Sequence, residues 1–572
     1  MKAISLALVL LVVRVMGTAG HPLVLSWWSP IAYLWHDAAV VLTFAAVEVL
    51  LRRQPRLVWA LYGVLAAYAV LNVPIERALS SPLTWTMWRA AGGPLADSIR
   101  HYATLVNVAL IGIGLAVAWL GPTAVRRVHP RPLLLALLAC AVLGPHAAAR
   151  VDTQGRERNA LTALGSSVTV GRAVSAEPRD WRASAIAAPA DDRLQRLRGT
   201  AAGRNVVVVA LESTGARYLG LYGAGEDVAP NLSELARSAV VFENAYAVYP
   251  ESIKGLWSVL CSLAPAFNTP AESQAKLPCH SMASVLGQKG YRTALFHSGR
   301  FDYLGMDAII RGRGFDVLAD AGDIGGVRES SFGIDERSAV AGILRWIDAA
   351  PEGRPFFVTY LPIAGHHPYE TPDRGPFPDH DEFGRYRNAL HYGDAALGEL
   401  RRGLEARGLD RQTLWIVLGD HGEAFGQHDG NYGHTFQLFD ENVRVPYVIA
   451  APGLVPAPIR ARHVVSLIDT APTVLDLLGI SSPRGYEGHS MLEGESRMAL
   501  FFTDYSLPLV GLRDGPRKII HDMRSGRTRW FDLERDPGES FDLSSAHADE
   551  VRRYRALLGS WVHRSRWDAA AR

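Results

Sequence analysis

Four short apolar runs in this chain lead into side chains that can hold a metal ion or a phosphate. Runs 205–211, 291–296, 355–361 and 414–419 are followed by Glu212, His297, His366 and the pair Asp420–His421. Short β-rich runs that alternate with helical stretches predict a parallel α/β sheet, and such sheets bind ligands beyond the carboxyl ends of their strands. We therefore expect these polar groups to gather at one edge of the sheet.

A fifth segment supplies a candidate nucleophile, Ser252. It opens a stretch with apolar residues at helical spacing, namely Ile253, Leu256, Trp257, Leu260 and Leu263. The hydroxyl would then lie at the positive end of a helix, whose amides can stabilise negative charge. We expect Ser252 to attack phosphorus with help from these amides.

The residues Glu212, Asp420 and His421 offer two oxygen donors and one nitrogen donor, with Ser252 as a fourth ligand. This set suits one divalent ion, Mn²⁺ or Zn²⁺ rather than Mg²⁺ or Ca²⁺. Such an ion lowers the pKa of a hydroxyl and activates it as a nucleophile. Each residue alone also has a structural explanation, as a helix N-cap, a strand-end carboxylate or a turn former. Their joint appearance at strand ends favours the metal site.

Composition indicates more than one domain and a membrane association. The chain has 572 residues, of which 48% are hydrophobic, and a net charge of +2, which suggests neither nucleic acid nor an acidic polymer as a partner. Residues 1–150 predict a bundle of about five transmembrane helices, near 3–19, 28–51, 57–74, 104–121 and 132–149. Residues 151–204 read as a linker with surface helices.

Two arginine-rich loops predict the orientation of these helices. One loop carries Arg52, Arg53 and Arg56 and the other Arg126, Arg127 and Arg131. Such loops favour the cytoplasmic side, which places the segment from about 75 to 103 and everything after the fifth span outside the cytoplasm.

Two alternatives remain open within the membrane segment. The first span fits either a retained anchor or a signal peptide, although Arg14 interrupts the apolar core that a signal peptide needs. Asp37 and Glu48, in the second span, either face the bundle interior or reach water near an interface.

Three cysteines occur, and Cys140 falls in the fifth span. Cys261 and Cys279 lie in the outer domain, where an oxidising compartment permits a disulfide bond. Closing that loop would stabilise the fold by about 3 kcal/mol. The alternative is a pair of buried free thiols.

Seven ordered segments between about residues 205 and 560 resemble the sulfatase branch of the alkaline phosphatase superfamily. They read NVVVVALESTGARYLGLYG, PNLSELARSAVVFENAYAVYP, GYRTALFHSG, LWIVLGDHGEAFGQH, VRVPYVIAAPG, SLIDTAPTVLDLLGI and RWFDLERDPGESFDL. The resemblance implies an α/β sandwich with a central mixed sheet between helices, over residues 205–499. It also implies a metal-bound hydroxyl nucleophile and a small carboxy-terminal subdomain, here residues 500–572.

The chain departs from true sulfatases in two places. The Cys/Ser-x-Pro-x-Arg signature for formylglycine is replaced by Ser252-Ile-Lys-Gly-Leu256, and Glu212 is followed by Ser213 rather than by a second acidic residue. Five spans before such a domain are instead similar to lipoteichoic acid synthases and lipid A phosphoethanolamine transferases. The resemblance implies a multi-pass protein of a bacterial-type cytoplasmic membrane with an extracytoplasmic catalytic domain. It would move phosphoglycerol or phosphoethanolamine from a phospholipid to an envelope glycolipid, glycan or polymer through a phosphoseryl intermediate.

The same resemblance suggests residues for the substrate. His366 matches a histidine near the transferred group and is expected to protonate the leaving oxygen. His434 stands where the phosphoethanolamine transferases have a histidine, and His297, Arg300 and Tyr303 are further substrate candidates. Lys254 would either meet a phosphate oxygen or be a solvated helix cation.

Two other functions remain compatible with the sequence. One is a hydrolase, either a phosphodiesterase or a sulfuric ester hydrolase, acting on a water-borne ester at the same metal site. The other is a non-catalytic protein that senses or binds envelope lipids.

Overall fold

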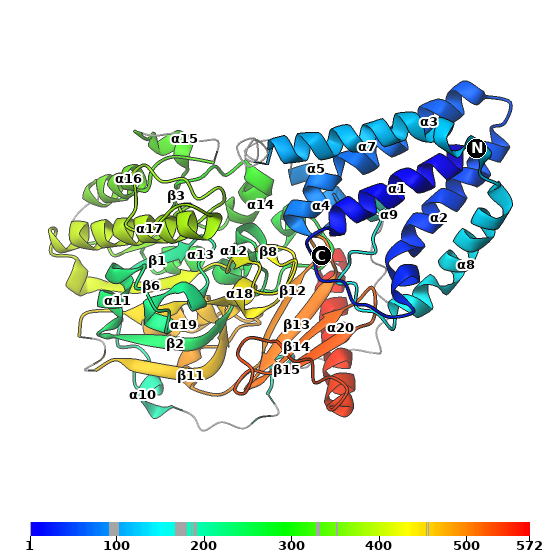
Figure 1. Ribbon diagram of the computed structural model, residues 1–572. Helices are drawn as coiled ribbons and strands as arrows, with labels where there is room; N and C mark the ends of the chain where they lie inside the picture. Colours follow the sequence, from blue (N-terminus) through cyan, green and yellow to red (C-terminus); the bar gives the residue numbers. More distant parts are fainter. Residues whose placement is uncertain are drawn as a thin grey trace.

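The computed structural model shows apolar amino-terminal helices beside a large α/β domain, which carries a smaller sheet at its carboxy-terminal end (Figure 1). It describes residues 2–90, 102–165, 180–184, 191–327, 332–349, 353–453 and 457–571, together with residues 186 and 455. Part of the predicted outer loop and part of the predicted linker lie outside these residues.

The amino-terminal part contains the apolar helices expected from the sequence. They are α1 (Lys2–Thr18), α2 (Ser29–Leu50), α3 (Pro55–Leu71), α4 (Val73–Leu79), α7 (Leu105–Ala124) and α8 (Pro130–Ala148), with the short α5 (Trp85–Ala90) in the outer loop. Four segments, α2, α3 with α4, α7 and α8, are long and apolar enough to cross a membrane. The first predicted span, α1, has 17 residues. At about 1.5 Å per residue it is somewhat shorter than a hydrocarbon core of about 30 Å.

Both acidic residues of α2 have partners on α1. Arg14 of α1 donates two hydrogen bonds of 3.0 Å to the carboxylate of Asp37 in α2. Glu48 accepts hydrogen bonds from the amides of Lys2 and Ala3 and so caps the start of α1. Of the two alternatives for Asp37, the structure supports the bundle interior, since the residue is 7% exposed.

The four predicted strands form the centre of a nine-stranded mixed sheet, with the path β11-β2-β10-β6-β1-β5-β3-β4 and β9 paired to β2. All four lie parallel to one another, whereas β10 is antiparallel to both of its neighbours. The strands are β1 (Asn205–Leu211), β2 (Ala239–Tyr246), β3 (Arg292–His297), β4 (Val317–Ala319), β5 (Phe356–Leu361), β6 (Thr413–Gly419), β9 (Arg444–Val445), β10 (Tyr447–Ala450) and β11 (Ile459–Ser466).

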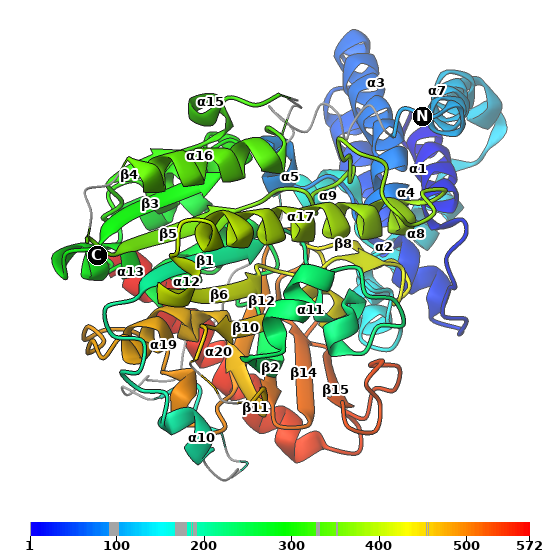
Figure 2. The same cartoon turned by 90° about the vertical axis from the view of Figure 1, so that its left-hand side faces the viewer.

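Helices cover both faces of this sheet, because successive side chains of a strand point to opposite faces. Val206 and Val208 pack into the core under α12 (Ser252–Cys261), α13 (Met282–Gln288), α14 (Met306–Ile310) and α19 (Thr470–Leu477). Val207 and Val209 pack into the opposite core under α11 (Pro230–Ala236), α16 (Glu336–Asp348) and α17 (Glu382–Glu405). Figure 2 shows α16 and α17 side by side over that face.

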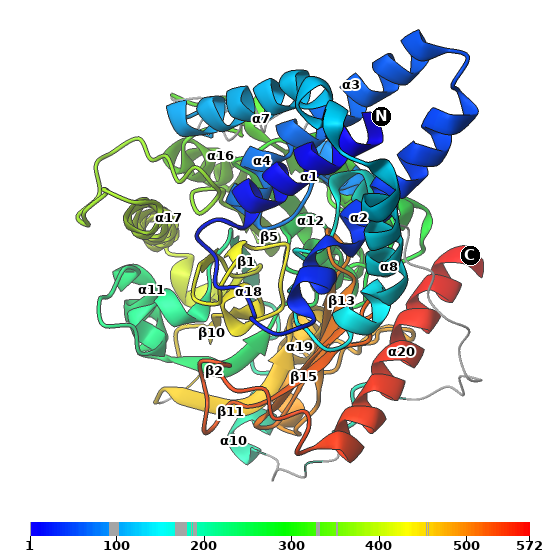
Figure 3. The ribbon, with the colours of Figure 1, turned by 45° about the vertical axis from the view of Figure 1, so that its right-hand side comes forward.

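A second, antiparallel sheet follows from residue 499, close to the predicted start of a carboxy-terminal subdomain. It consists of β12 (Ala499–Thr503), β13 (Leu509–Asp514), β14 (Arg517–Asp522) and β15 (Thr528–Asp532) in chain order. The last helix, α20 (Ala548–Ala571), packs along this sheet (Figure 3). Smaller elements are α9 (Ala160–Gly165), α10 (Asp192–Gln195), α15 (Ala321–Ile324), α18 (Asp440–Val443) and the hairpin of β7 (Ala424–Phe425) and β8 (Tyr432–Gly433).

Two connections brace the catalytic part. Cys261, at the end of α12, forms a disulfide bond with Cys279, as the sequence predicts, so these thiols are not free. Residues 151–160, at the start of the predicted linker, are mostly buried despite their polar composition. They lie between the helices and the catalytic domain, where Asp152 pairs with Arg529 of β15.

Candidate active site

Strand register brings the predicted metal ligands together. Leu211, the last residue of β1, pairs with Gly419, the last residue of β6, so Glu212 and Asp420 both follow directly at the same edge. The Oγ atom of Ser252, the first residue of α12, lies 2.7 Å from Glu212 Oε2 and 2.6 Å from Asp420 Oδ2. It lies 3.3 Å from His421 Nε2. The structure therefore brings together all four residues that the sequence predicts for this site.

The loops after the strands aim these carboxylates. The Ser213 amide donates a hydrogen bond of 3.0 Å to Asp420 Oδ1, and the Ser213 hydroxyl donates one of 2.9 Å to Glu212 Oε1. The His421 amide also donates to Asp420 Oδ1, at 2.7 Å. Each carboxylate thus has one oxygen held by the loop and the other directed at Ser252. Ser213 orients Glu212 from the position where the sulfatase pattern has a second acid.

His421 presents one nitrogen to this cluster. Its Nδ1 lies 2.9 Å from the Gly422 carbonyl, to which it donates, and its Nε2 faces Glu212 Oε1 at 3.4 Å and Asp420 Oδ2 at 3.7 Å. Burial disfavours the imidazolium, but Asp420 and Glu212 outweigh burial and raise the pKa of His421 to about 10. Burial, together with the charge of Glu212, raises the pKa of Asp420 to about 7. The pKa of Glu212 is lowered, because the hydrogen bond and charge of His421 overcome its burial.

This donor set fits one divalent ion. One ligand atom from each of Glu212, Asp420 and His421 lies within 4.8 Å of the other two, and all three residues are buried. Two buried carboxylates that face one another are costly unless a cation compensates them. Two carboxylate oxygens, an imidazole nitrogen and the Ser252 hydroxyl suit a transition ion such as Mn²⁺ or Zn²⁺.

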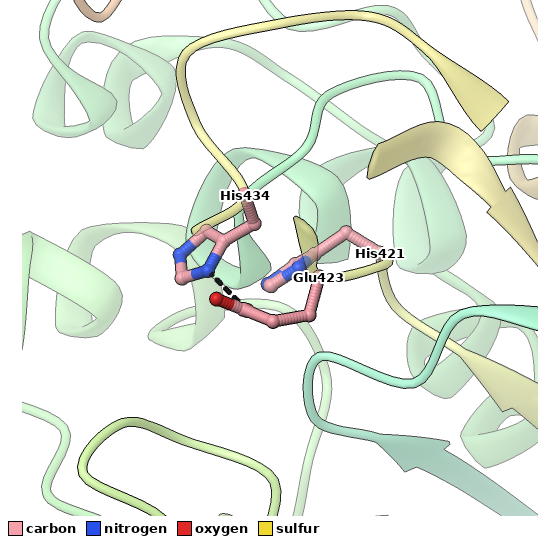
Figure 4. Close-up of side chains that lie close together, drawn as sticks. All are labelled: His421, Glu423 and His434. Carbon is pink, nitrogen blue, oxygen red and sulfur yellow. Dashed lines mark hydrogen bonds and ion pairs between the residues drawn. The ribbon is translucent and has the colours of Figure 1, made fainter. Parts of the chain in front are cut away.

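A second group of possible ligands, His421, Glu423 and His434, lies beside the first (Figure 4). His434 Nδ1 lies 2.8 Å from Glu423 Oε2, and the hydroxyl of Tyr369 donates to Glu423 Oε1 at 3.0 Å. Because the free nitrogen of His421 faces the first cluster, we interpret Glu423 as the partner that orients His434 and not as a ligand of a second ion. Glu423 was not among the site residues expected from the sequence, although it stands two residues after His421.

His366 belongs to the loop after β5, and its ring lies next to that of His434. Its Nδ1 is 2.7 Å from the carbonyl of His367, which leaves Nε2 available, and its ring centroid is 6.4 Å from that of His434. Tyr303 faces His366 edge-on at 6.3 Å. Burial lowers the pKa of His366, so the neutral imidazole predominates near pH 7. A neutral imidazole can accept a proton from an attacking hydroxyl.

Two other substrate candidates have different surroundings. His297 Nδ1 lies 2.9 Å from the Leu361 carbonyl of the neighbouring strand, and its ring stacks on Phe301. The guanidinium of Arg300 lies beside Gly322 of α15. Both side chains thus contact other groups of the protein. A role of His297 or Arg300 in substrate binding stays a prediction.

Lys254 is not a solvated helix cation. It is 6% exposed, and its Nζ lies 2.9 Å from both carboxylate oxygens of Asp504, in the loop after β12. Tyr249 also donates to Asp504 Oδ1, at 2.8 Å. The charge of Lys254 is thus committed to a buried ion pair that joins the start of α12 to the second sheet.

The start of α12 differs from the sequence expectation in one more respect. The N-cap is Glu251, not Ser252, and its carboxylate accepts hydrogen bonds from the amides of Ile253 at 3.0 Å and Lys254 at 3.3 Å. Amides that we expected to face a phosphoryl group are therefore bonded to the protein's own carboxylate. Burial raises the pKa of Glu251.

Comparison with known proteins finds similar sequences and similar folds. Residues 204–480 match the family model described as Sulfatase. A lipoteichoic acid synthase-like protein of Bacillus subtilis (strain 168) is 25% identical over an alignment of 323 positions, which covers 52% of this chain and 51% of that protein. Among solved structures, a lipoteichoic acid synthase from Listeria monocytogenes superposes with a TM-score of 0.52 at 21% identity, covering 65% of this chain and 94% of that one. An alkaline phosphatase superfamily protein from Vibrio parahaemolyticus superposes with a TM-score of 0.53 at 19% identity, covering 66% and 96%.

The matches cover only part of the curated relatives' length, and their sequence identity is low. The chain spans about half the length of the curated lipoteichoic acid synthases that it matches. The superpositions, at this identity, establish the fold. Residues 204–480 thus match the Sulfatase family model, and the domain that contains them has the α/β fold of these solved structures. It is joined to amino-terminal helices that are apolar enough to span a membrane.

Proposed function

We propose that this protein is a membrane-bound, metal-dependent transferase that moves a phosphoglycerol or phosphoethanolamine group from a phospholipid to an envelope acceptor. The acceptor would be a glycolipid, a glycan or a polymer end. The observation that carries the proposal is the position of Ser252 Oγ, within 2.7 Å of one oxygen each of Glu212 and Asp420, in a chain without the formylglycine signature. An unmodified hydroxyl so placed suits attack on phosphorus.

The reaction runs in two steps through a phosphoseryl enzyme. Ser252 Oγ forms a bond to phosphorus, and the bond to the diacylglycerol oxygen breaks. The acceptor hydroxyl then attacks the same phosphorus, and the bond to Ser252 breaks. A divalent ion at Glu212, Asp420 and His421, which we take to be Mn²⁺ or Zn²⁺, would supply positive charge that lowers the pKa of the hydroxyl and stabilises the phosphoryl oxygens.

His366 and His434 would serve both steps from the other side of the site. In the first step the proton that Ser252 loses passes to the leaving diacylglycerol oxygen through Nε2 of neutral His366, which takes it up and then releases it. In the second step the same nitrogen takes the proton of the acceptor hydroxyl, and that proton returns to Ser252 Oγ. His434, whose Nδ1 is held by Glu423, would meet the substrate with its Nε2 atom.

The placement of the helices supports an extracytoplasmic catalytic domain. His21 and Ser81, at one end of the bundle, contact Asp429 and Ser506 of the catalytic part, and the carbonyl of Ala148 accepts from Arg527. The arginine-rich loops join the helices at the opposite end, which favours the cytoplasmic side for those loops. Protease added to intact spheroplasts should therefore digest the domain after residue 150, whereas full protection would contradict the topology.

Mass spectrometry of Ser252 tests the transferase directly. Purified protein exposed to a membrane lipid extract and then acid-quenched should carry an added phosphoglycerol or phosphoethanolamine group on this serine. The Ser252→Ala variant, treated in the same way, is the control and should carry none. Transfer of the headgroup by that variant at the wild-type rate would show that no phosphoseryl intermediate lies on the path.

A hydrolase is the second candidate, supported by the match of residues 204–480 to the Sulfatase family. It would use the same serine and ion, with water as the acceptor. Product analysis with a lipid donor separates the two functions, because a transferase needs the acceptor for turnover and a hydrolase releases the free headgroup phosphate without it.

A further inference from the structure

One short hairpin carries two of the groups that border the site. Glu423 precedes β7 and His434 follows β8, and these strands have two residues each. An isolated two-stranded hairpin is marginally stable at best, and this one is far shorter than usual. Its position must therefore be set by contacts outside the hairpin.

The tip of this hairpin is held by residues of the amino-terminal part. Asp429 Oδ1 lies 3.1 Å from Nδ1 of His21, in the loop after α1, and Asp429 Oδ2 accepts a hydrogen bond from Arg156. The next residue, Gly430, has φ of +75°, and a Cβ atom there would come within 2.6 Å of Arg156 Nη2. Ion pair and close approach together fix the tip against Arg156.

Arg156 is itself fixed by the helix bundle. The guanidinium of Arg14, paired with Asp37, donates to the carbonyl of Arg156 and, at 3.0 Å, to that of Arg158. Nδ2 of Asn159 donates to Asp37 at 2.6 Å. Helix α4 also packs directly against β8. A continuous series of polar contacts thus leads from α1 and α2 to the hairpin tip.

The catalytic domain holds the same hairpin from its own side. His428 Nδ1 lies 2.6 Å from Oε1 of Glu441 in α18, and Asn431 donates to Glu441 and Asn442 at 2.9 and 2.8 Å. Gln427 donates to Tyr218 at 2.8 Å. These bonds hold the flank of the hairpin, whereas Asp429 is its ion-pair link to the membrane segment.

We infer that Asp429 is a positioning residue of the active site, through which docking of the amino-terminal helices sets the place of Glu423 and His434. The catalytic domain would reach its full rate only while the bundle holds the hairpin tip. The inference rests on the proposed function only in taking His434 as part of the substrate site.

The test uses the full-length protein in detergent or nanodiscs, with the Asp429→Asn variant. Its substrates are bis-p-nitrophenyl phosphate and p-nitrophenyl sulfate, so that either ester chemistry is detected. Mutations along such a series of contacts change the energetic coupling between the two ends by about 2- to 30-fold. We therefore expect kcat to fall about tenfold, while the melting temperature and the metal content stay unchanged. Asp429→Glu, which keeps the charge, should recover most of the rate.

The matched control is Arg524→Gln. Arg524 Nη2 pairs with Glu157 Oε1 at 2.5 Å, so this change also breaks an ion pair between the linker and the catalytic part, away from the hairpin. It should leave kcat unchanged. An equal loss of kcat in both variants would overturn the inference and assign the effect to domain docking in general.

A double variant separates positioning from a structural role. On a His434→Asn background, Asp429→Asn should change kcat by less than about twofold, because both act through the same imidazole. A full tenfold loss on that background would contradict action through His434.

Amide hydrogen exchange gives a reading that needs no substrate. The amides of Gly426 and Asn431, bonded within the hairpin at 2.8 and 2.9 Å, should exchange about tenfold faster in Asp429→Asn but not in Arg524→Gln. Unchanged exchange and unchanged kcat in Asp429→Asn would refute the inference. Failure of lipid transfer in the wild-type protein would refute the proposed function alone.

Discussion

Metal binding at Glu212, Asp420 and His421 should release protons in a number that the structure predicts. Without the ion, His421 has a pKa of about 10 and Asp420 one of about 7, while the pKa of Glu212 is lowered. At pH 7 the ion must displace one proton from His421 and about half a proton from Asp420, since metal ligands bind deprotonated. The metal-bound state holds fewer protons than the metal-free state. The affinity for the metal must therefore rise with pH. The apparent association constant should increase about 30-fold per pH unit near pH 7 and about tenfold per unit above pH 8.

Titration calorimetry in buffers of different ionisation enthalpy measures this proton count. The wild-type protein should release about 1.5 protons at pH 7 if Ser252 keeps its hydroxyl proton, and about one more if it gives that proton up. The Ser252→Ala variant supplies the reference, since the difference between the two counts is the contribution of the serine. His434→Asn is the control for a neighbouring imidazole and should leave the count unchanged. Affinity that does not vary with pH between 6 and 8 would refute both the ligand assignment and the electrostatic reasoning.

Three substitutions test other parts of the structure. Ser252→Ala should abolish turnover of any ester that the wild type cleaves, and Ser252→Thr should keep part of it because a hydroxyl remains; normal turnover by the alanine variant would exclude this nucleophile. Cys279→Ser, which opens the loop to Cys261, should lower the free energy of unfolding by about 3 kcal/mol in denaturant titrations, and an unchanged midpoint would contradict a stabilising bond. Lys254→Met leaves Asp504 buried without a cation and should cost about 3 to 5 kcal/mol, part of which Asp504→Leu should restore in the double variant. A double variant less stable than Lys254→Met would count against the pair.

The strands and the first ligands could be predicted because both depend on local patterns. Run 205–211 is wholly buried in β1 and run 414–419 forms nearly all of β6, so their length and apolarity identified them as strands of a parallel sheet. The register then follows from parallel pairing, which places Glu212 and Asp420 at one edge. Ser252 was found in the same way, from the helical spacing after it.

Partners that lie far apart in the chain could not be predicted. Lys254 and Asp504 are separated by 250 residues, and His21 and Asp429 by 408. An apolar pattern reports which face of an element is buried but carries no information on which distant charge will meet a buried cation. Glu251 was missed for a related reason, because either of two adjacent polar residues fits an N-cap until the backbone angles are known.

The pairing of Arg14 with Asp37 also bears on how the chain enters a bilayer. A single charge costs about 2.5 to 3.5 kcal/mol at the middle of a membrane helix and less toward its end, so each of these helices would bear part of that cost if it were inserted alone. Inserted together as a helical hairpin, α1 and α2 present a neutral, hydrogen-bonded pair instead. Proteolytic removal of α1 after translocation would strip Asp37 of its cation and free the carbonyls of residues 156–158. The Arg14–Asp37 pair therefore ties α1 and α2 into one packed unit.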